Sequence, residues 1–146
     1  MTDKPVACRQ RVLIDVNTRT TATPPRLQTL YAPSIYVLNA AALSKPGAVQ
    51  HLAADLQSYG TSVAVITETH LKAKHTDSIV SIDGFTLYRR DRTGRRGGGV
   101  AVYVTSDLRS ARWTPSVAVT GALEIDWVRV GDRAFVAALY NTPRPT

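Results

Sequence analysis

The sequence predicts an α/β fold in which a strand–helix–strand unit is followed by a series of short neighbouring strands. Three observations indicate this unit: a strand-like run at Ile35–Asn39, a helical apolar stripe after Ser44, and a continuous apolar run at Val63–Thr67. Strands joined through a helix usually pair in parallel, because the helix returns the chain to the edge where the first strand began. The later strands are connected by short turns and favour antiparallel pairing. We therefore expect a mixed sheet.

Each element of the first unit has a local reason. Ile35–Asn39 is β-branched and aromatic at its start and ends on a polar residue. Ser44 is a candidate helix N-cap, Pro46 suits the first helical turn, and Gly60 suits the end of the helix. The apolar stripe between them consists of Val49, Leu52, Ala53, Leu56 and Tyr59. The uninterrupted apolar character of Val63–Thr67 is typical of a strand that is covered on both faces.

The second half of the chain contains several short strand-like runs, separated by turns that contain glycine. The predicted strands are Phe85 to Tyr88, Val100 to Val104, Leu123 to Val130 and Ala134 to Tyr140. Apolar and polar residues alternate in Leu123 to Val130 with a rough period of two. Gly131-Asp132 favours a hairpin turn between the last two strands. The triplet Gly97-Gly98-Gly99 is not a nucleotide-binding loop, since no Lys-Ser or Lys-Thr follows, and it favours a tight turn.

The chain of 146 residues has the length of one domain. Residues 1–34 are rich in Thr, Pro and Arg, and apart from a short run at Val12 to Val16 they show no helical or strand period. We interpret them as a mobile basic leader, and residues 35–146 as a partial domain.

Composition indicates an intracellular protein, nuclear or cytoplasmic. The single cysteine, Cys8, cannot form an internal disulfide, and the N-terminus has no apolar signal core. The longest apolar stretch, Ile35 to Leu43, is interrupted by Asn39 and is far shorter than the ~18 residues that span a bilayer. We expect no membrane association.

The formal charge of +7 is concentrated in two places. Residues 1–34 contribute +3, the segment 89–96 contributes +4, and the rest of the chain sums to zero. The basic side chains of the second segment are Arg89, Arg90, Arg92, Arg95 and Arg96. Guanidinium groups pair with phosphate in a bidentate way, so this cluster favours a nucleic-acid partner. A solvated loop that aids solubility is the alternative.

Polar side chains end three of the predicted strands: Asn39, Glu68 and Tyr140. In α/β sheets ligands commonly bind beyond strand ends, and one carboxylate is a suitable ligand for Mg²⁺. An amide can orient the carboxylate, and a phenol can donate to a phosphate oxygen. The alternatives are a surface glutamate, a turn-capping asparagine and an edge tyrosine. His70 and His75 are interpreted as surface residues rather than zinc ligands, because their spacing does not place both imidazoles on one helical face.

Five segments in order resemble the endonuclease/exonuclease/phosphatase superfamily, and specifically the apurinic-endonuclease-like domain of non-LTR retrotransposon proteins. They are Val37 to Ala40 around Asn39, Ile66 to Leu71 around Glu68, Gly84 to Arg92, Arg96 to Val104, and Leu139 to Pro145 around Tyr140. The most specific match is Arg-Gly-Gly-Gly followed by an apolar strand, which is typical of the retrotransposon branch. The resemblance extends from Ile35 to Pro145.

The resemblance implies the N-terminal part of a four-layered α/β sandwich that hydrolyses DNA phosphodiesters with Mg²⁺ or Mn²⁺. It implies that Glu68 binds the metal, that Asn39 and Tyr140 support it, and that a reverse transcriptase follows in the intact polyprotein. The family's later Asp-x-Asn and Ser-Asp-His motifs do not occur after Tyr140 in this sequence. We therefore expect a truncated domain that alone scarcely nicks DNA, with one apolar sheet face uncovered and one strand edge unpaired. Marginal stability or self-association would follow.

Two other functions are compatible with the residues. A non-catalytic nucleic-acid-binding module would use only the arginine cluster, and its binding would survive removal of metal and fall steeply with salt. A phosphatase-type member of the same superfamily would act on a small phosphorylated substrate.

Overall fold

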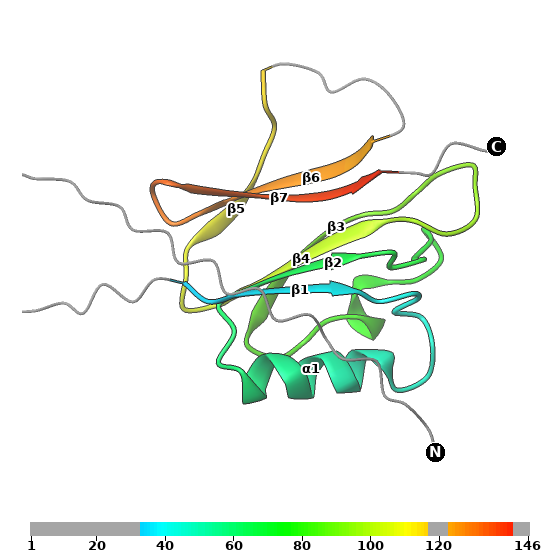
Figure 1. Ribbon diagram of the computed structural model, residues 1–146, viewed down its shortest axis with the longest axis horizontal. Helices are drawn as coiled ribbons and strands as arrows, with labels where there is room; N and C mark the ends of the chain where they lie inside the picture. The colour runs from blue at the N-terminus through cyan, green and yellow to red at the C-terminus, as the bar shows by residue number, and fades with distance from the viewer. Residues whose placement is uncertain (1–32, 117–122, 142–146) are drawn as a thin grey trace, which may run out of the picture.

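The computed structural model describes residues 33–116 and 123–141, which form one α-helix and two β-sheets in three layers (Figure 1). Helix α1 (Ala48–Ser58) covers one face of a four-stranded sheet, and a three-stranded sheet packs against the other face. The mixed α/β class predicted from the sequence is confirmed. The predicted leader, residues 1–34, lies almost wholly outside the described residues.

The predicted strand–helix–strand unit is present, and its two strands pair in parallel. Strand β1 (Ile35–Asn39) aligns residue by residue with β2 (Val63–Thr67), from Ile35 opposite Val63 to Asn39 opposite Thr67. This register brings the ends of both strands to the same edge of the sheet. Strand β2 is buried on both faces over its first four residues, as its continuous apolar sequence predicts.

The start of α1 differs from the sequence prediction. Ser44 is not its N-cap; the helix begins at Ala48, after Gly47, whose φ of 78° is left-handed. The preceding segment is held on the loop after β2 instead, because Ala42 N donates to Glu68 O and Leu43 N donates to Thr69 O. Tyr59 also lies outside the core and stacks on Tyr36. No helix within residues 33–116 and 123–141 is long and apolar enough to cross a membrane.

The four-stranded sheet is mixed and has the order β1-β2-β4-β3. Strand β4 (Val100–Thr105) pairs antiparallel with β2, and β3 (Phe85–Arg90) pairs antiparallel with β4. Strand β3 extends two residues beyond its predicted end at Tyr88, because Arg89 and Arg90 continue the ladder with β4. A short 3₁₀-helix, η1 (Asp77–Ile79), precedes β3.

The three-stranded sheet has the order β5-β6-β7 and is antiparallel throughout. Strands β6 (Leu123–Val130) and β7 (Ala134–Asn141) form the predicted hairpin around Gly131, which has a φ of 61°. Strand β5 (Ser110–Trp113) was not predicted. Its four residues are too few for a recognisable period, so pairing with β6 decides their conformation.

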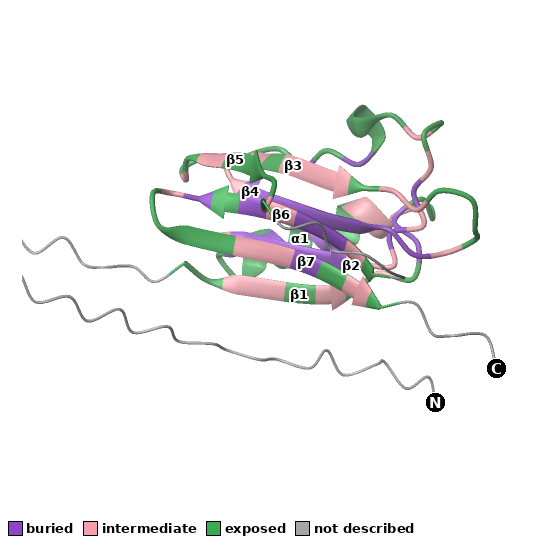
Figure 2. Ribbon diagram, turned by 90° about the horizontal axis from the view of Figure 1, so that it is seen from above, coloured by how far each residue is buried: buried purple, intermediate pink, exposed green. Residues whose placement is uncertain are grey.

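Two apolar clusters hold the layers together. The first lies between α1 and the four-stranded sheet, with Leu52, Leu56, Ile66 and Tyr103 fully buried. The second lies between the sheets and consists largely of valines, a β-branched composition that suits facing sheets. In Figure 2 burial is greatest along β2 and β4, the inner strands of the larger sheet.

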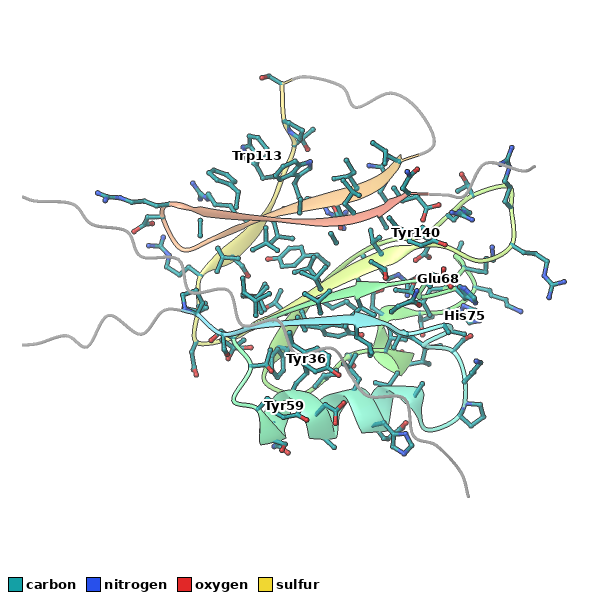
Figure 3. All side chains as sticks on the ribbon, in the orientation of Figure 1. Tyr36, Tyr59, Glu68, His75, Trp113 and Tyr140 are labelled. Atoms are coloured by element: carbon teal, nitrogen blue, oxygen red, sulfur yellow. The ribbon has the colours of Figure 1, made fainter. Side chains whose placement is uncertain are left out.

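The outer face of the three-stranded sheet, directed away from the larger sheet, exposes apolar side chains. Exposed members are Trp113, Leu123, Phe135 and Leu139, with Trp113 visible on this side in Figure 3. Trp113 contacts Trp127 edge-on and lies 4.8 Å from Phe135 between ring centroids. Strand β7 pairs with β6 alone among the described strands, so an apolar face and a strand edge are both open there. Self-association through these features stays a prediction.

Changing Phe135 and Leu139 to threonine should reduce self-association with little effect on the fold, because both side chains are about half exposed. We expect the unfolding free energy to fall by about 1 kcal/mol per substitution at most, the larger part at Phe135, which loses its ring contact with Trp113. Sedimentation velocity over a range of concentrations measures the association. The matched control is Thr86→Ser on β3, an exposed position that should leave association unchanged. An unaltered concentration dependence in the threonine variant would contradict the prediction.

Candidate functional site

Three strand ends meet at one edge of the molecule and bring the predicted residues Asn39, Glu68 and Tyr140 together. Asn39 is the last residue of β1, Glu68 follows β2, and Tyr140 lies near the end of β7 in the other sheet. The Tyr140 hydroxyl donates to Glu68 Oε1 at 2.5 Å, and the Asn39 side chain also hydrogen-bonds the Glu68 carboxylate. Figure 3 shows Tyr140 and Glu68 directed toward each other from the two sheets. The side chain of Glu68 remains 26% exposed, so a ligand can reach it.

The surroundings of Glu68 favour its charged form. The hydrogen bond from Tyr140 is the main reason that the pKa of Glu68 lies below its usual value. Burial, the second-largest influence, opposes it, and Asn39 and His70 each lower the pKa further. The same bond raises the pKa of Tyr140. At neutral pH the site therefore holds a carboxylate anion and a neutral phenol donor.

His70 belongs to this site, although the sequence indicated a surface residue. Its Nε2 lies 3.5 Å from Glu68 Oε2. Glu68 and His70 both have a left-handed backbone, with φ of 51° and 53°, so a turn rather than an extended strand sets the directions of their side chains. Nothing in the spacing of the sequence signals this turn, so local pattern alone did not find His70. His75 lies elsewhere, where its Nδ1 accepts from Lys72 N at 2.9 Å.

Strained backbone concentrates at the site. Within residues 33–116 and 123–141, positive φ occurs outside glycine at Ala41, Ala42, Glu68 and His70, all in the loops after β1 and β2. Such conformations cost of order 1 kcal/mol or more each and persist where surrounding contacts enforce them. Ala42 N donates to Glu68 O, and Ala41 N donates to Asn39 Oδ1 at 3.2 Å. The cross-bonded loops hold the Glu68 carboxylate at the strand end.

The glycine loop (residues 97–99) supports the turn at Glu68 from the other side. All three glycines have positive φ, as their predicted turn requires. Gly99 O accepts from Thr69 N at 3.2 Å, and Gly98 O accepts from His70 N at 2.9 Å. A side chain at residue 99 would lie 2.5 Å from Thr69 Oγ1, so the approach requires glycine.

The five arginines predicted to bind nucleic acid fall into two groups. Arg95 and Arg96 are exposed, as are the preceding residues Thr93 and Gly94. The other three are committed to internal contacts. Arg89 bonds Asp77, Asp91 and His75 O, Arg90 donates to Ile125 O, and Arg92 pairs with Glu124. The structure therefore leaves Arg95 and Arg96 free to meet an external phosphate, and leaves Arg90, an exposed residue bonded through Nη1, partly free.

Glu68 fits one part of a magnesium site. Mg²⁺ typically takes one or two protein carboxylates and keeps several waters, and the partly exposed Glu68 carboxylate is one such ligand. The other nearby carboxylate, Glu124, is already bonded to Arg92 and to Gly99 N. Among the described residues no group of three or more acidic, histidine or cysteine side chains is placed to hold a metal. Any ion here would depend on Glu68, solvent and substrate oxygens.

Comparison with known proteins supports the fold but does not assign a family. No protein-family model matches the sequence, and no curated protein matches it. Among solved structures, the AP endonuclease LMAP from Leishmania major superimposes with a TM-score of 0.55 and 20% sequence identity. The match covers 73% of this chain and 39% of that chain, so the likeness spans well under half of the AP endonuclease. The mixed α/β architecture is thus similar to an AP endonuclease fold.

Tyr140→Phe should destabilise the protein by about 1 kcal/mol at neutral pH, the typical net value of a hydrogen bond, since Glu68 is partly exposed. The folded-state pKa of Glu68 is below the unfolded value of about 4.3. Its stabilising contribution is therefore present above pH 4.3 and disappears as the pH falls through the folded-state pKa. The difference between variant and parent should shrink in that window. Urea unfolding across a pH series measures it.

Tyr88→Phe is the matched control, because the Tyr88 hydroxyl bonds the neutral Ser110 hydroxyl at 2.9 Å. Its effect on the unfolding free energy should be the same at every pH. If Tyr140→Phe behaved identically to this control, the lowered pKa of Glu68 would be refuted.

Proposed function

We propose that this chain carries the Glu68 side of the metal site in a DNA-nicking endonuclease domain of the non-LTR retrotransposon type. The observation that carries the proposal is the fixed Glu68 anion, which Tyr140 and Asn39 hold where three strand ends meet. The likeness to an AP endonuclease fold supports a nuclease-type architecture. The Arg-Gly-Gly-Gly segment at residues 96–99 supports the retrotransposon branch, and DNA is the substrate that this resemblance implies.

Glu68 would hold the Mg²⁺ or Mn²⁺ ion, with Asn39 and Tyr140 orienting its carboxylate. When bound, such an ion polarises a phosphoryl oxygen of the substrate. The protein's own contribution is to keep Glu68 ionised and correctly directed, through the hydrogen bonds from Tyr140 and Asn39. The phenol of Tyr140, kept neutral by its raised pKa, is also a donor for a phosphate oxygen.

Catalysis also needs a group that orients and deprotonates the attacking water. Within the described residues, the site contains no second carboxylate free of internal pairing and no Asp–His pair. Loss of general-base assistance typically costs 10²–10⁴-fold. The chain alone should therefore nick DNA weakly at best, and the remainder of a retrotransposon polyprotein is the proposed partner. An intracellular location, nuclear or cytoplasmic, accords with a DNA substrate.

Incubation of the chain with supercoiled plasmid and Mg²⁺ tests the proposal, with formation of the relaxed circle as the readout. Any nicking should disappear in Glu68→Ala, because that change removes the carboxylate proposed to hold the metal. The matched control is Asp107→Asn, at an exposed position in the turn after β4. Glu124 is unsuitable as a control position because its carboxylate accepts from Gly99 N in the glycine loop. Nicking that persisted in Glu68→Ala would contradict the assigned role.

Non-catalytic nucleic-acid binding is a second candidate, and the exposure of Arg95 and Arg96 favours it. Lys72 lies beside them, since its Nζ donates to Arg95 O at 2.8 Å. Together these side chains place positive charge next to the Glu68 site. Arg89 and Arg90 would contribute less than their sequence suggests, because their guanidinium groups bond the protein itself.

Arg95→Ala and Arg96→Ala should each weaken binding of duplex DNA and lower the slope of log affinity against log salt by about 0.9. Fluorescence anisotropy with labelled duplex in EDTA measures both quantities. Arg129→Ala, an exposed position on β6 in the other sheet, is the matched control and should leave the slope unchanged. An equal change of slope in Arg129→Ala would show that the net charge of the protein, rather than the position of Arg95 and Arg96, determines DNA binding, and would contradict the prediction.

A further inference from the structure

Arg92 and Glu124 form an ion pair directly behind the Glu68 site. Glu124 Oε1 accepts from Arg92 Nε, and Glu124 Oε2 accepts from Gly99 N at 2.6 Å. The two side chains are only 12% and 16% exposed. One carboxylate thus joins β6, the glycine loop and the segment after β3.

Arg92 extends this connection to Tyr140 and to the rest of the glycine loop. Its guanidinium carbon lies 5.6 Å from the centroid of the Tyr140 ring, within the range of a cation–π contact. Its Nη1 donates to Arg96 O at 3.2 Å. Its guanidinium packs where a side chain at Gly98 would be, since a Cβ there would lie 2.4 Å from Arg92 Cζ.

Each member of the pair is connected to Glu68 or its neighbour through one further residue. Tyr140, covered by Arg92, donates to the Glu68 carboxylate. Gly99, held by Glu124, accepts from Thr69 N, the residue that follows Glu68. Loss of either member would disturb both the phenol and the glycine loop. Arg92 contacts the Tyr140 ring and Arg96 O, and Glu124 holds Gly99 N and faces Tyr140 across β6 and β7.

We infer that the Arg92–Glu124 pair positions the Glu68 site, and that Arg92 is not a phosphate-binding arginine. This inference rests on the proposed function of Glu68 as a metal ligand. The donors of Arg92 explain the assignment: Nε bonds Glu124, Nη1 bonds a backbone carbonyl, and Nη2 is buried. The guanidinium therefore has no pair of accessible N–H groups that could bind a phosphate in a bidentate way.

Binding of Mn²⁺ alone to the full chain tests the inference, with free Mn²⁺ measured by electron paramagnetic resonance. Arg92→Ala and Glu124→Gln should each weaken Mn²⁺ binding by about 10- to 100-fold, as expected for groups that orient a ligand. The double variant should be no worse than either single one, because both changes break the same connection. Glu124→Gln keeps the volume of the side chain, so it serves if Arg92→Ala fails to fold by circular dichroism.

Arg112→Ala is the matched control. Arg112 on β5 pairs at 2.9 Å with Asp126, which lies on β6 with Glu124. The hydrogen bonds of this pair do not include Asn39, Glu68 or Tyr140. Its loss should leave Mn²⁺ affinity within about twofold while breaking a comparable ion pair. An equal weakening in Arg112→Ala would show a general loss of structure and overturn the inference.

DNA binding gives an independent readout. Arg92→Ala should leave the salt slope of duplex binding unchanged, whereas Arg95→Ala lowers it by about 0.9. A lowered slope in Arg92→Ala would make Arg92 a phosphate contact and overturn the inference. Unchanged Mn²⁺ affinity in both pair variants, beside a large loss in Glu68→Ala, would also overturn it and leave the proposed function standing. Unchanged affinity in Glu68→Ala would overturn both.

Discussion

Strand β2 lies between β1 and β4, and its first four residues are buried on both faces. Val63 and Val65 belong to the cluster between the sheets, and Ala64 and Ile66 belong to the cluster under α1. Because both cores depend on this strand, its position along the sheet is fixed. Glu68 follows directly after it, so the packing of two apolar cores determines where the carboxylate lies.

The site is assembled by backbone bonds as much as by side chains. The loop after β1 donates to Glu68 O and Thr69 O, and the glycine loop accepts from Thr69 N and His70 N. The turn at Glu68 is therefore held from two sides, which explains how left-handed backbone at Glu68 and His70 persists. Tyr140 then adds the contact from the second sheet. The left-handed backbone at Glu68 and His70 is tolerated because hydrogen bonds from several segments hold this turn in place.

Most of the clustered arginines make contacts within the protein, which their sequence pattern did not indicate. Of the five clustered arginines, Arg89, Arg90 and Arg92 bond carboxylates or backbone carbonyls of the protein. Buried or half-buried guanidinium groups need such partners, because an unpaired charge away from water is costly. Arg95 and Arg96 lie at the tip of the loop, where solvent screens them and an external phosphate can approach. Sequence proximity of the five residues therefore does not imply a shared role.

The sequence alone determined the parallel crossover of β1 and β2, the β6–β7 hairpin and the tight turn at the glycine loop, because local periodicity and glycine content specify them. It also singled out Asn39, Glu68 and Tyr140, which end predicted strands. Only the tertiary structure decided the late start of α1, the existence of β5, and the places of His70 and Glu124. Each of these depends on contacts between segments far apart in the chain, and such contacts leave no period in the sequence.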